Sequence, residues 1–241
     1  MSLTQQIKSS QILLMRKQNN IFQEGLVNMR EIYQEHLEQL ENSVFNLANE
    51  VYHTIERSIN VLSNDDINEA REIIKHDEVI NQMEYDINDQ IVSLITKQQP
   101  IATDLRKILS SIRIAAELER IGDNASNIAK IRKRVKLEDH YVLTRLKTMG
   151  KLSMLMLQDL KVAYETKDMN LVKEIIERDK DIDDLYKEII NTTYLIDNDP
   201  YIAGQAHLAG RYLERTGDHI TNIAENIYYV ITGQRYDQIP N

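Results

Sequence analysis

The sequence contains one segment twice, as ERIGDNASNIA at residues 119–129 and as ERTGDHITNIA at residues 214–224. Seven of the eleven positions are identical. Charge patterns on helices often resemble one another by accident, but the same Glu, Arg, Gly, Asp, Asn, Ile and Ala in register do not. The chain is therefore predicted to be an internal duplication, with a first repeat at residues 29–136 and a second at residues 137–241.

Helical periodicity surrounds both copies. Apolar residues recur every three or four positions, most regularly at Leu37, Leu40, Val44, Leu47, Val51, Ile55, Ile59 and Leu62, as they do on the buried face of an amphipathic helix. Glycine (7 residues) and proline (3 residues) are scarce in the chain. The pattern predicts helices over residues 32–62, 67–95, 100–135, 141–165, 171–195 and 200–231.

The breaks between these helices carry the residues that begin a new helix. The cluster Ser63-Asn64-Asp65-Asp66 is suited to close one helix and N-cap the next, and Asp168 is a natural N-cap. Pro100 fits a first turn, and Asn198-Asp199-Pro200 restarts the chain. Connections this short make neighbouring helices antiparallel. We therefore predict an all-α fold, a tandem duplication of two antiparallel three-helix bundles.

Composition excludes several classes of protein. The chain has no cysteine, so disulfides, zinc ribbons, iron–sulfur clusters and thiol catalysis are ruled out. No apolar run is long enough to span a membrane, and a net charge of −9 argues against nucleic-acid binding. Residues 1–28 have weak periodicity and fall outside both repeats. One hypothesis is that the native start is Met29. A cytoplasmic location is expected.

Acidic pairs spaced one helical turn apart are the candidate site. Side chains four positions apart share a face of a helix. The pairs are Asp77 with Asn81 and Glu119 with Asp123 in the first repeat, then Asp179 with Asp183 and Glu214 with Asp218 in the second. In each repeat the midpoint between the two pairs falls at or beside a proline, Pro100 or Pro200. A hairpin closing there brings each pair level with its partner.

Carboxylates brought together inside a bundle must be protonated, paired with cations or bound to metal. Oxygen ligands suit iron, manganese, magnesium, calcium or, less typically, zinc. Asn81 offers only a neutral oxygen, so the second site is expected to bind metal more tightly. Gly122 and Gly217 lie inside the helices, where glycine costs about 1 kcal/mol relative to alanine, a cost that a close approach beside the site would explain.

Other interpretations stay open at this point. The acidic pairs could instead form a solvated face, with Arg120 or Arg215 as the cation. His219 is expected to be at the surface or behind the site, and Asn127 and Asn222 to be auxiliary ligands or helix contacts. Glu50-x-x-His53 is the chain's only Glu-x-x-His and is interpreted as chance. No catalytic residues are predicted, although a carboxylate-bridged metal oxidase or hydrolase is the alternative function.

The doubled Glu-Arg-x-Gly-Asp-x-x-x-Asn-Ile-Ala segment, with QPIATDLR at residues 99–106 before the first copy, resembles the PhoU family of phosphate-uptake regulators. The resemblance covers residues 29–232. The second repeat departs from it by lacking the Asp-Leu-Arg run after Pro200. The family implies two three-helix bundles with multinuclear metal clusters, of iron or zinc, with manganese or magnesium as further possibilities. Its ligand positions are those in the acidic pairs, and Asn81 departs from the family's aspartate.

The resemblance also implies a function. Members are non-enzymatic cytoplasmic regulators that repress the phosphate-starvation response and restrain the phosphate ABC transporter. They contact the ATPase subunit of that transporter and the phosphate-responsive sensor histidine kinase, and they meet the membrane only through these partners. A homodimer is expected.

Overall fold

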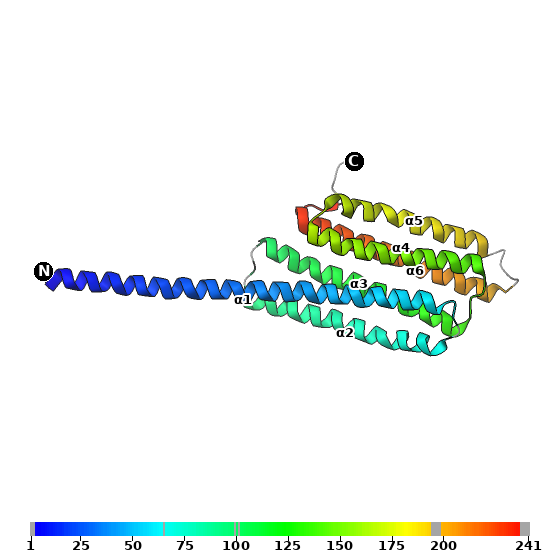
Figure 1. Cartoon of the computed structure of the whole chain (residues 1–241), viewed down its shortest axis with the longest axis horizontal. Helices are drawn as coiled ribbons and strands as arrows, with labels where there is room; N and C mark the ends of the chain where they lie inside the picture. The colour runs from blue at the N-terminus through cyan, green and yellow to red at the C-terminus, as the bar shows by residue number, and fades with distance from the viewer. Residues whose placement is uncertain (1–2, 65, 99, 101, 194–198, 237–241) are drawn as a thin grey trace.

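The computed structural model describes the backbone of residues 3–64, 66–98, 100, 102–193 and 199–236, and side chains from Arg30 onward except at Gln98 and Thr193. Its helices are α1 (Leu3–Val61), α2 (Ile67–Gln98), α3 (Ala102–Arg134), α4 (His140–Thr166), α5 (Met169–Thr193) and α6 (Pro200–Thr232). The all-α prediction is confirmed. Helices α1–α3 form one antiparallel bundle and helices α4–α6 form the other (Figure 1).

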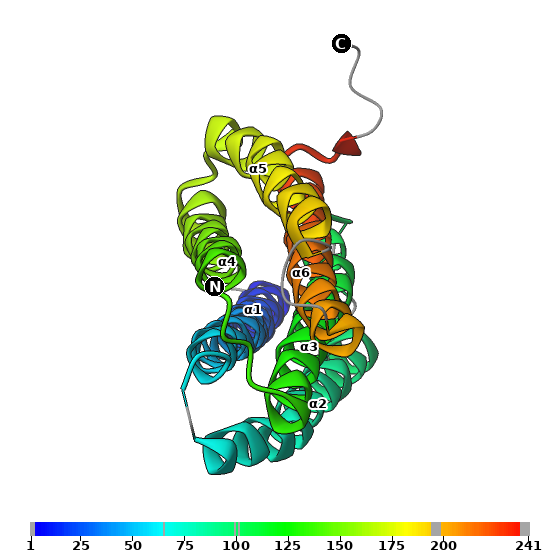
Figure 2. The same cartoon turned by 90° about the vertical axis from the view of Figure 1, so that its right-hand side faces the viewer.

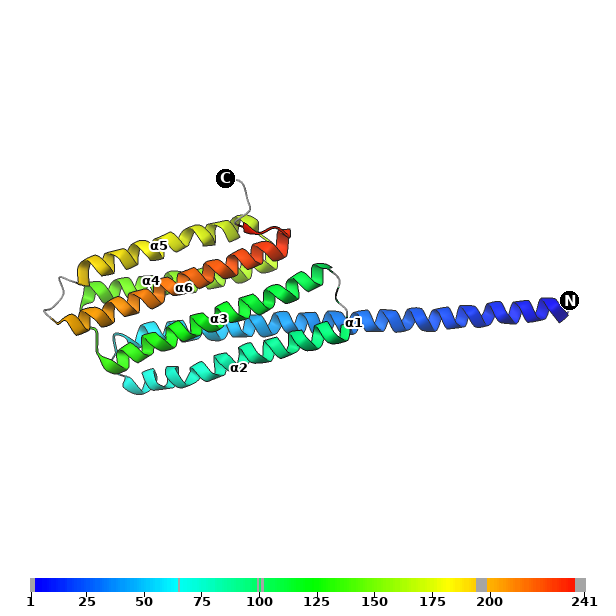
Figure 3. The same ribbon diagram turned by 180° about the vertical axis from the view of Figure 1, so that it is seen from behind.

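The first helix is longer than predicted. It was expected to begin near Ile32, but α1 begins at Leu3, and its N-terminal part projects beyond the bundles as a single helix (Figure 3). The first proline of the chain is Pro100, and Gly25 is the only glycine in α1. Since helices end at such residues or at capping sites, no local signal stops this one. Weak periodicity was therefore a poor reason to exclude the segment from the helix.

The predicted N-caps of α2 and α5 are confirmed, and Asp199 caps α6 as well. The side chain of Asp66 accepts a hydrogen bond from the amide of Glu69 (3.0 Å), which starts α2. Asp168 accepts from Leu171 (3.1 Å) and Asp199 from Tyr201 (2.9 Å). Pro200 occupies the first turn of α6. Helix α3 begins at Ala102, slightly after the predicted Pro100, and the expected end of α5 at Leu195 lies outside the described residues.

The two bundles share one hydrophobic core, to which all six helices contribute. Helix α1 lies against α4 and helix α3 against α6, so two helix pairs form the contact between the bundles (Figure 2). Helices α3 and α6 run in opposite directions (Figure 1). Among the described helices, none is long and apolar enough to cross a membrane. The α3–α6 contact places the two copies of the repeated segment side by side.

Candidate metal sites

The first site lies in the hairpin of α2 and α3. Burial raises the pKa of Asp77, and the charge of Asp123 on the facing helix raises it further. Burial also raises the pKa of Glu119, with added repulsion from Asp123, Glu84 and Asp77. These carboxylates therefore act on one another across the hairpin. The close approach comes from Gly122, where a Cβ would lie only 2.9 Å from the Ile80 side chain of α2.

The second site lies in the hairpin of α5 and α6. The pKa of Asp179 is raised to about 6, first by burial and then by Asp218, Asp183 and Glu214. The pKa of Glu214 is raised by burial and by Asp218 and Asp183. All four predicted acidic residues of this repeat thus repel one another. Gly217 makes the approach possible, because a Cβ at this position would collide with Asp179 Oδ1.

Several oxygens in the two sites are buried without a hydrogen-bond partner. They are Asp77 Oδ1, Asn81 Oδ1, Asp179 Oδ1 and Glu214 Oε2. Asp123 and Asp218 are exposed, whereas the other six predicted ligand residues are partly buried, so each site is open to solvent on one side. Buried oxygen acceptors lacking donors cost free energy unless a proton, a water or a cation reaches them. The donor set therefore fits a hard or borderline cation.

The described acidic side chains do not form a complete coordination shell as they stand. In the described part of the chain, no three histidine or acidic side chains are grouped closely enough to hold one metal ion as they stand. Side-chain rotation would be needed to complete a shell. Metal binding at these eight residues consequently remains a prediction, supported by their charge and by the partnerless oxygens.

Glu84 is an acidic neighbour of the first site that the sequence analysis missed. It is partly buried on α2 and raises the pKa of Glu119. Glu84 lies seven residues, or two helical turns, after Asp77 and on the same helix face as Asn81. This spacing could have identified Glu84 from the sequence. The matching residue of the second repeat is Tyr186, whose hydroxyl contacts His207 Nε2 (2.6 Å). Glu84 thus supplies a negative charge that Asn81 does not.

His219 is buried between the bundles, so the expectation of a surface position is wrong. Its Nδ1 lies 2.6 Å from Oε2 of Glu117 on α3, and Asn222 donates to the same oxygen (3.2 Å). The side chains of Glu117 and His219 are only 14% and 11% exposed. Although burial acts to raise the pKa of Glu117, the hydrogen bonds from His219 and Asn222 hold it below its ordinary value. His219 Nε2 is buried without a partner.

At the first site, Arg120 pairs with a carboxylate outside the predicted acidic pairs. Arg120 is bound to Glu117 (3.0 Å), on the side facing the other bundle, although its charge lowers the pKa of Glu119 to some extent. In the second repeat, Arg211 pairs with Glu214, a partner that was not predicted, while Arg215 only lowers the pKa of that residue. Each site therefore keeps an excess of negative charge.

The remaining candidates have ordinary partners. Glu50 Oε1 lies 2.6 Å from Nε2 of His76, and His53 lies near Glu56 (3.7 Å), so the two residues of the Glu-x-x-His pattern bind elsewhere. Asn222 makes the helix contact that was one of its two expected roles. Asn127 accepts a hydrogen bond from Lys130 (3.1 Å). The auxiliary-ligand role that was one of the two expected for Asn127 stays a prediction.

Comparisons with known proteins identify the repeat. The PhoU domain family model matches residues 44–131 and 146–227. The phosphate-specific transport system accessory protein PhoU homolog of Clostridium acetobutylicum is 35% identical over 214 residues, 86% of this chain and 98% of that protein. The Escherichia coli K12 accessory protein PhoU is 31% identical over 208 residues, 84% of this chain and 86% of that protein.

Solved structures agree with the sequence matches. The crystal structure of PhoU from Pseudomonas aeruginosa superposes with a TM-score of 0.78 at 28% identity, covering 84% of this chain and 100% of that one. The phosphate transport system regulatory protein PhoU from Streptococcus pneumoniae superposes with a TM-score of 0.76 at 32% identity, covering 85% and 99%. In both superpositions this chain covers nearly the whole length of the solved chain.

Proposed function

This chain belongs to the PhoU family of phosphate transport accessory and regulatory proteins, and on that premise we propose that it regulates phosphate uptake and that its two hairpins bind metal clusters. The carboxylate-bridged enzyme considered as an alternative is set aside, because the family consists of non-enzymatic regulators. The regulator is proposed to act in the cytoplasm.

One observation carries the metal part of the proposal. Two hairpins, built from different stretches of the chain, each gather mutually repelling carboxylates and leave buried oxygens without donors. The ligands are Asp77, Asn81, Glu119 and Asp123 in the first repeat, and Asp179, Asp183, Glu214 and Asp218 in the second. Iron or zinc is the proposed metal, with manganese or magnesium as alternatives. A bound cation would remove the repulsion and thereby stabilise the folded hairpins.

The regulatory part of the proposal rests on the family. Relatives carry the description of phosphate-specific transport system accessory protein. We propose that this chain, as a homodimer, contacts the ATPase subunit of a phosphate ABC transporter and a phosphate-responsive sensor kinase, and through them restrains uptake and represses the starvation response. Deletion of the gene should then raise phosphate uptake and starvation-gene expression, and unchanged values of both would contradict this role.

Elemental analysis tests the metal sites. Protein purified without chelator should contain metal, and Asp179→Asn with Asp218→Asn should remove the share bound by the second repeat. Asp77→Asn with Asp123→Asn should remove the share of the first. Asp86→Asn is the matched control, because this exposed residue of α2 is hydrogen-bonded to Gln82 (2.8 Å) outside the site. Lack of metal in both purified and reconstituted protein would refute the metal proposal.

A further inference from the structure

A groove between the bundles contains residues that the metal sites do not use. The segment QPIATDLR, present only before the first repeat, leads into α3, and its Thr103 and Arg106 line the groove together with Lys107. The opposite side comes from the second bundle and includes Tyr164 and Lys167 at the end of α4. The groove has a volume of about 430 Å³, within the range of small-molecule sites.

Arg106 is held in place at this groove by the C-terminal end of α6. Its guanidinium carbon lies 5.7 Å from the ring centroid of Tyr229, in a cation–π contact. The helix ends at Gly233, whose φ of +76° is left-handed, and a Cβ there would lie 2.9 Å from the guanidinium carbon. Among the described residues, no carboxylate forms an ion pair with Arg106. A fixed guanidinium without an acidic partner is therefore available to a ligand.

The other charges of the groove leave a local positive excess. Glu41 forms an ion pair with Lys107 (3.1 Å) and accepts a hydrogen bond from the hydroxyl of Tyr164 (2.8 Å), so the charges of Glu41 and Lys107 balance each other. Lys167 is exposed beside the groove, and Glu165 is the other acidic residue of the lining. Arg106 and Lys167 thus outnumber the one remaining acidic group. This excess is notable in a chain with a net charge of −9.

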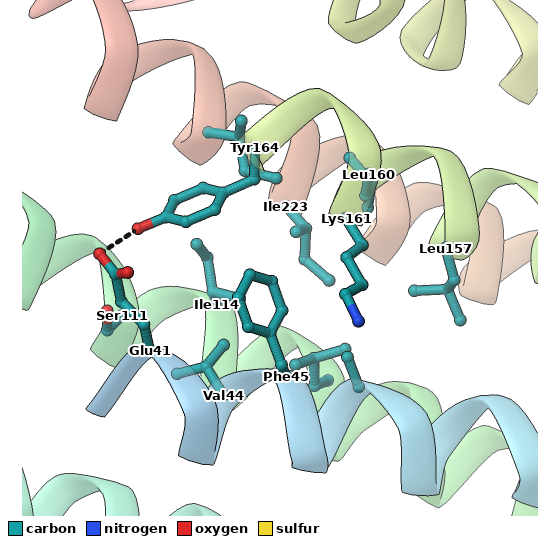
Figure 4. Close-up of a pocket in the computed structure, with 13 residues that line it drawn as sticks. Glu41, Val44, Phe45, Ser111, Ile114, Leu157, Leu160, Lys161, Tyr164 and Ile223 are labelled. Atoms are coloured by element: carbon teal, nitrogen blue, oxygen red, sulfur yellow. Dashed lines mark hydrogen bonds between the residues drawn. The ribbon is translucent and has the colours of Figure 1, made fainter. Parts of the chain in front are cut away.

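An apolar cavity of about 60 Å³ adjoins the groove and shares Glu41, Phe45 and Tyr164 with it. Figure 4 shows the Tyr164–Glu41 hydrogen bond at one end of this cavity, with Phe45, Leu157 and Ile223 around the apolar part. Its volume is enough for a few waters or a small apolar group. Low-polarity walls beside the groove strengthen any charge interaction made there.

We propose that the groove between the bundles binds a phosphoryl oxyanion, held by Arg106 and Lys167 and bordered by Thr103. The planar guanidinium matches the oxygens of phosphate in a two-bond geometry, whereas the lysine supplies a point charge. The choice of phosphate among oxyanions rests on the proposed role in phosphate regulation. The oxyanion is either inorganic phosphate or the head of a small phosphate monoester, whose organic part would enter the apolar cavity.

Such a ligand would join the two bundles. Arg106 belongs to α3 of the first bundle and Lys167 follows α4 of the second. An anion bound by both therefore stabilises the arrangement in which the bundles are docked, because only that arrangement provides both cations. Binding in the groove is separate from the acidic sites, which lie in the hairpins within each bundle.

The test is isothermal titration calorimetry of the full chain after chelator treatment, with inorganic phosphate, phenyl phosphate and sulfate as probes. Chelation makes the result independent of the metal proposal. Phosphate or phenyl phosphate should bind more tightly than sulfate, and Arg106→Gln should weaken that binding about tenfold or more, as expected for loss of a charged hydrogen-bond pair. Lys167→Gln should weaken it several-fold. Arg113→Gln, which removes an exposed charge from the same helix outside the groove, should leave it unchanged.

Each outcome decides the proposal. Binding of phenyl phosphate alone supports the site and assigns it to an organic phosphate, and binding of both supports inorganic phosphate as a sufficient ligand. Absence of binding by either probe overturns the proposal, as does equal binding of sulfate. Affinity that is unchanged in both Arg106→Gln and Lys167→Gln also overturns it. If Arg106→Gln unfolds by circular dichroism, the exposed Lys167 variant decides alone.

Discussion

Replacing Gly217 by alanine tests whether the close approach of α6 to Asp179 assembles the second acidic site. A Cβ at Gly217 would collide with Asp179 Oδ1 and lie 3.2 Å from the Ile182 side chain. Gly204 provides a matched control in the same helix, because no heavy atom lies within 4 Å of a Cβ built there. Both substitutions change glycine to alanine, so their difference isolates the contact.

The expected magnitudes follow from two opposing effects. Alanine in place of glycine inside a helix stabilises it by about 1 kcal/mol. Added volume in a packed position costs about 1–3 kcal/mol. Gly204→Ala should therefore stabilise the protein by up to about 1 kcal/mol, whereas Gly217→Ala should be neutral or destabilising by up to about 2 kcal/mol. Because Asp179 must also move, Gly217→Ala should lose metal from the second repeat.

Urea unfolding of chelator-treated protein, followed by circular dichroism, gives the free energies of unfolding. Elemental analysis of untreated protein gives the metal content. The variants should have equal m-values, which shows that the change lies in stability rather than in the amount of surface exposed. Gly217→Ala that is as stable as Gly204→Ala and retains the wild-type metal content would refute the reasoning, because the glycine would then serve no close approach.

Three further predictions concern charge. In metal-free protein the free energy of unfolding should fall as pH rises from about 4 to 6. The reason is that folded Asp179, with a pKa of about 6, still holds a proton that the unfolded chain releases near its ordinary pKa of 3.8. Urea titrations should show this pH dependence reduced in Asp179→Asn and absent once metal is bound, and an unchanged dependence would contradict the prediction. His219→Ala should cost about 1.5–3 kcal/mol by urea unfolding, because it removes a buried bond to the charged Glu117, and a double-mutant cycle without coupling would argue against the pair. Glu84→Gln should lower the metal affinity of the first repeat in competition titrations, while Tyr186→Phe leaves the second unchanged; equal effects would exclude Glu84 from the site.

The helices could be predicted from the sequence wherever a local signal fixes them. Asp66, Asp168 and Asp199 cap helices through bonds to amides two or three residues away, so sequence alone locates them. The start of α1 could not be predicted in that way. Periodic burial marks only the part of a helix that packs against a core, and α1 continues beyond the bundles. Its periodicity therefore ends before the helix does.

The gathering of acidic side chains in each hairpin was predictable because the register of a hairpin follows from its turn. Pairs whose midpoint falls at Pro100 or beside Pro200 come level with each other, and the mutual effects on the pKa values of Asp77, Glu119 and Asp179 agree with this register. The contact between the repeats had no comparable signal. Glu117 has Tyr212 as its counterpart in the duplication, and the register of α3 against α6 is set by side-chain packing across the bundles rather than by a short connection.

Helices α3 and α6 each serve two contacts at the same level. Glu117 and Glu119 are two positions apart, about 200° around the helix, so one faces α6 while the other faces the acidic site beside α2. On α6, Asp218 faces its own site and the adjacent His219 binds Glu117. The repeated segment therefore lines an acidic site on one face and the contact between the bundles on the other, which gives a physical reason for both copies to lie in the contact.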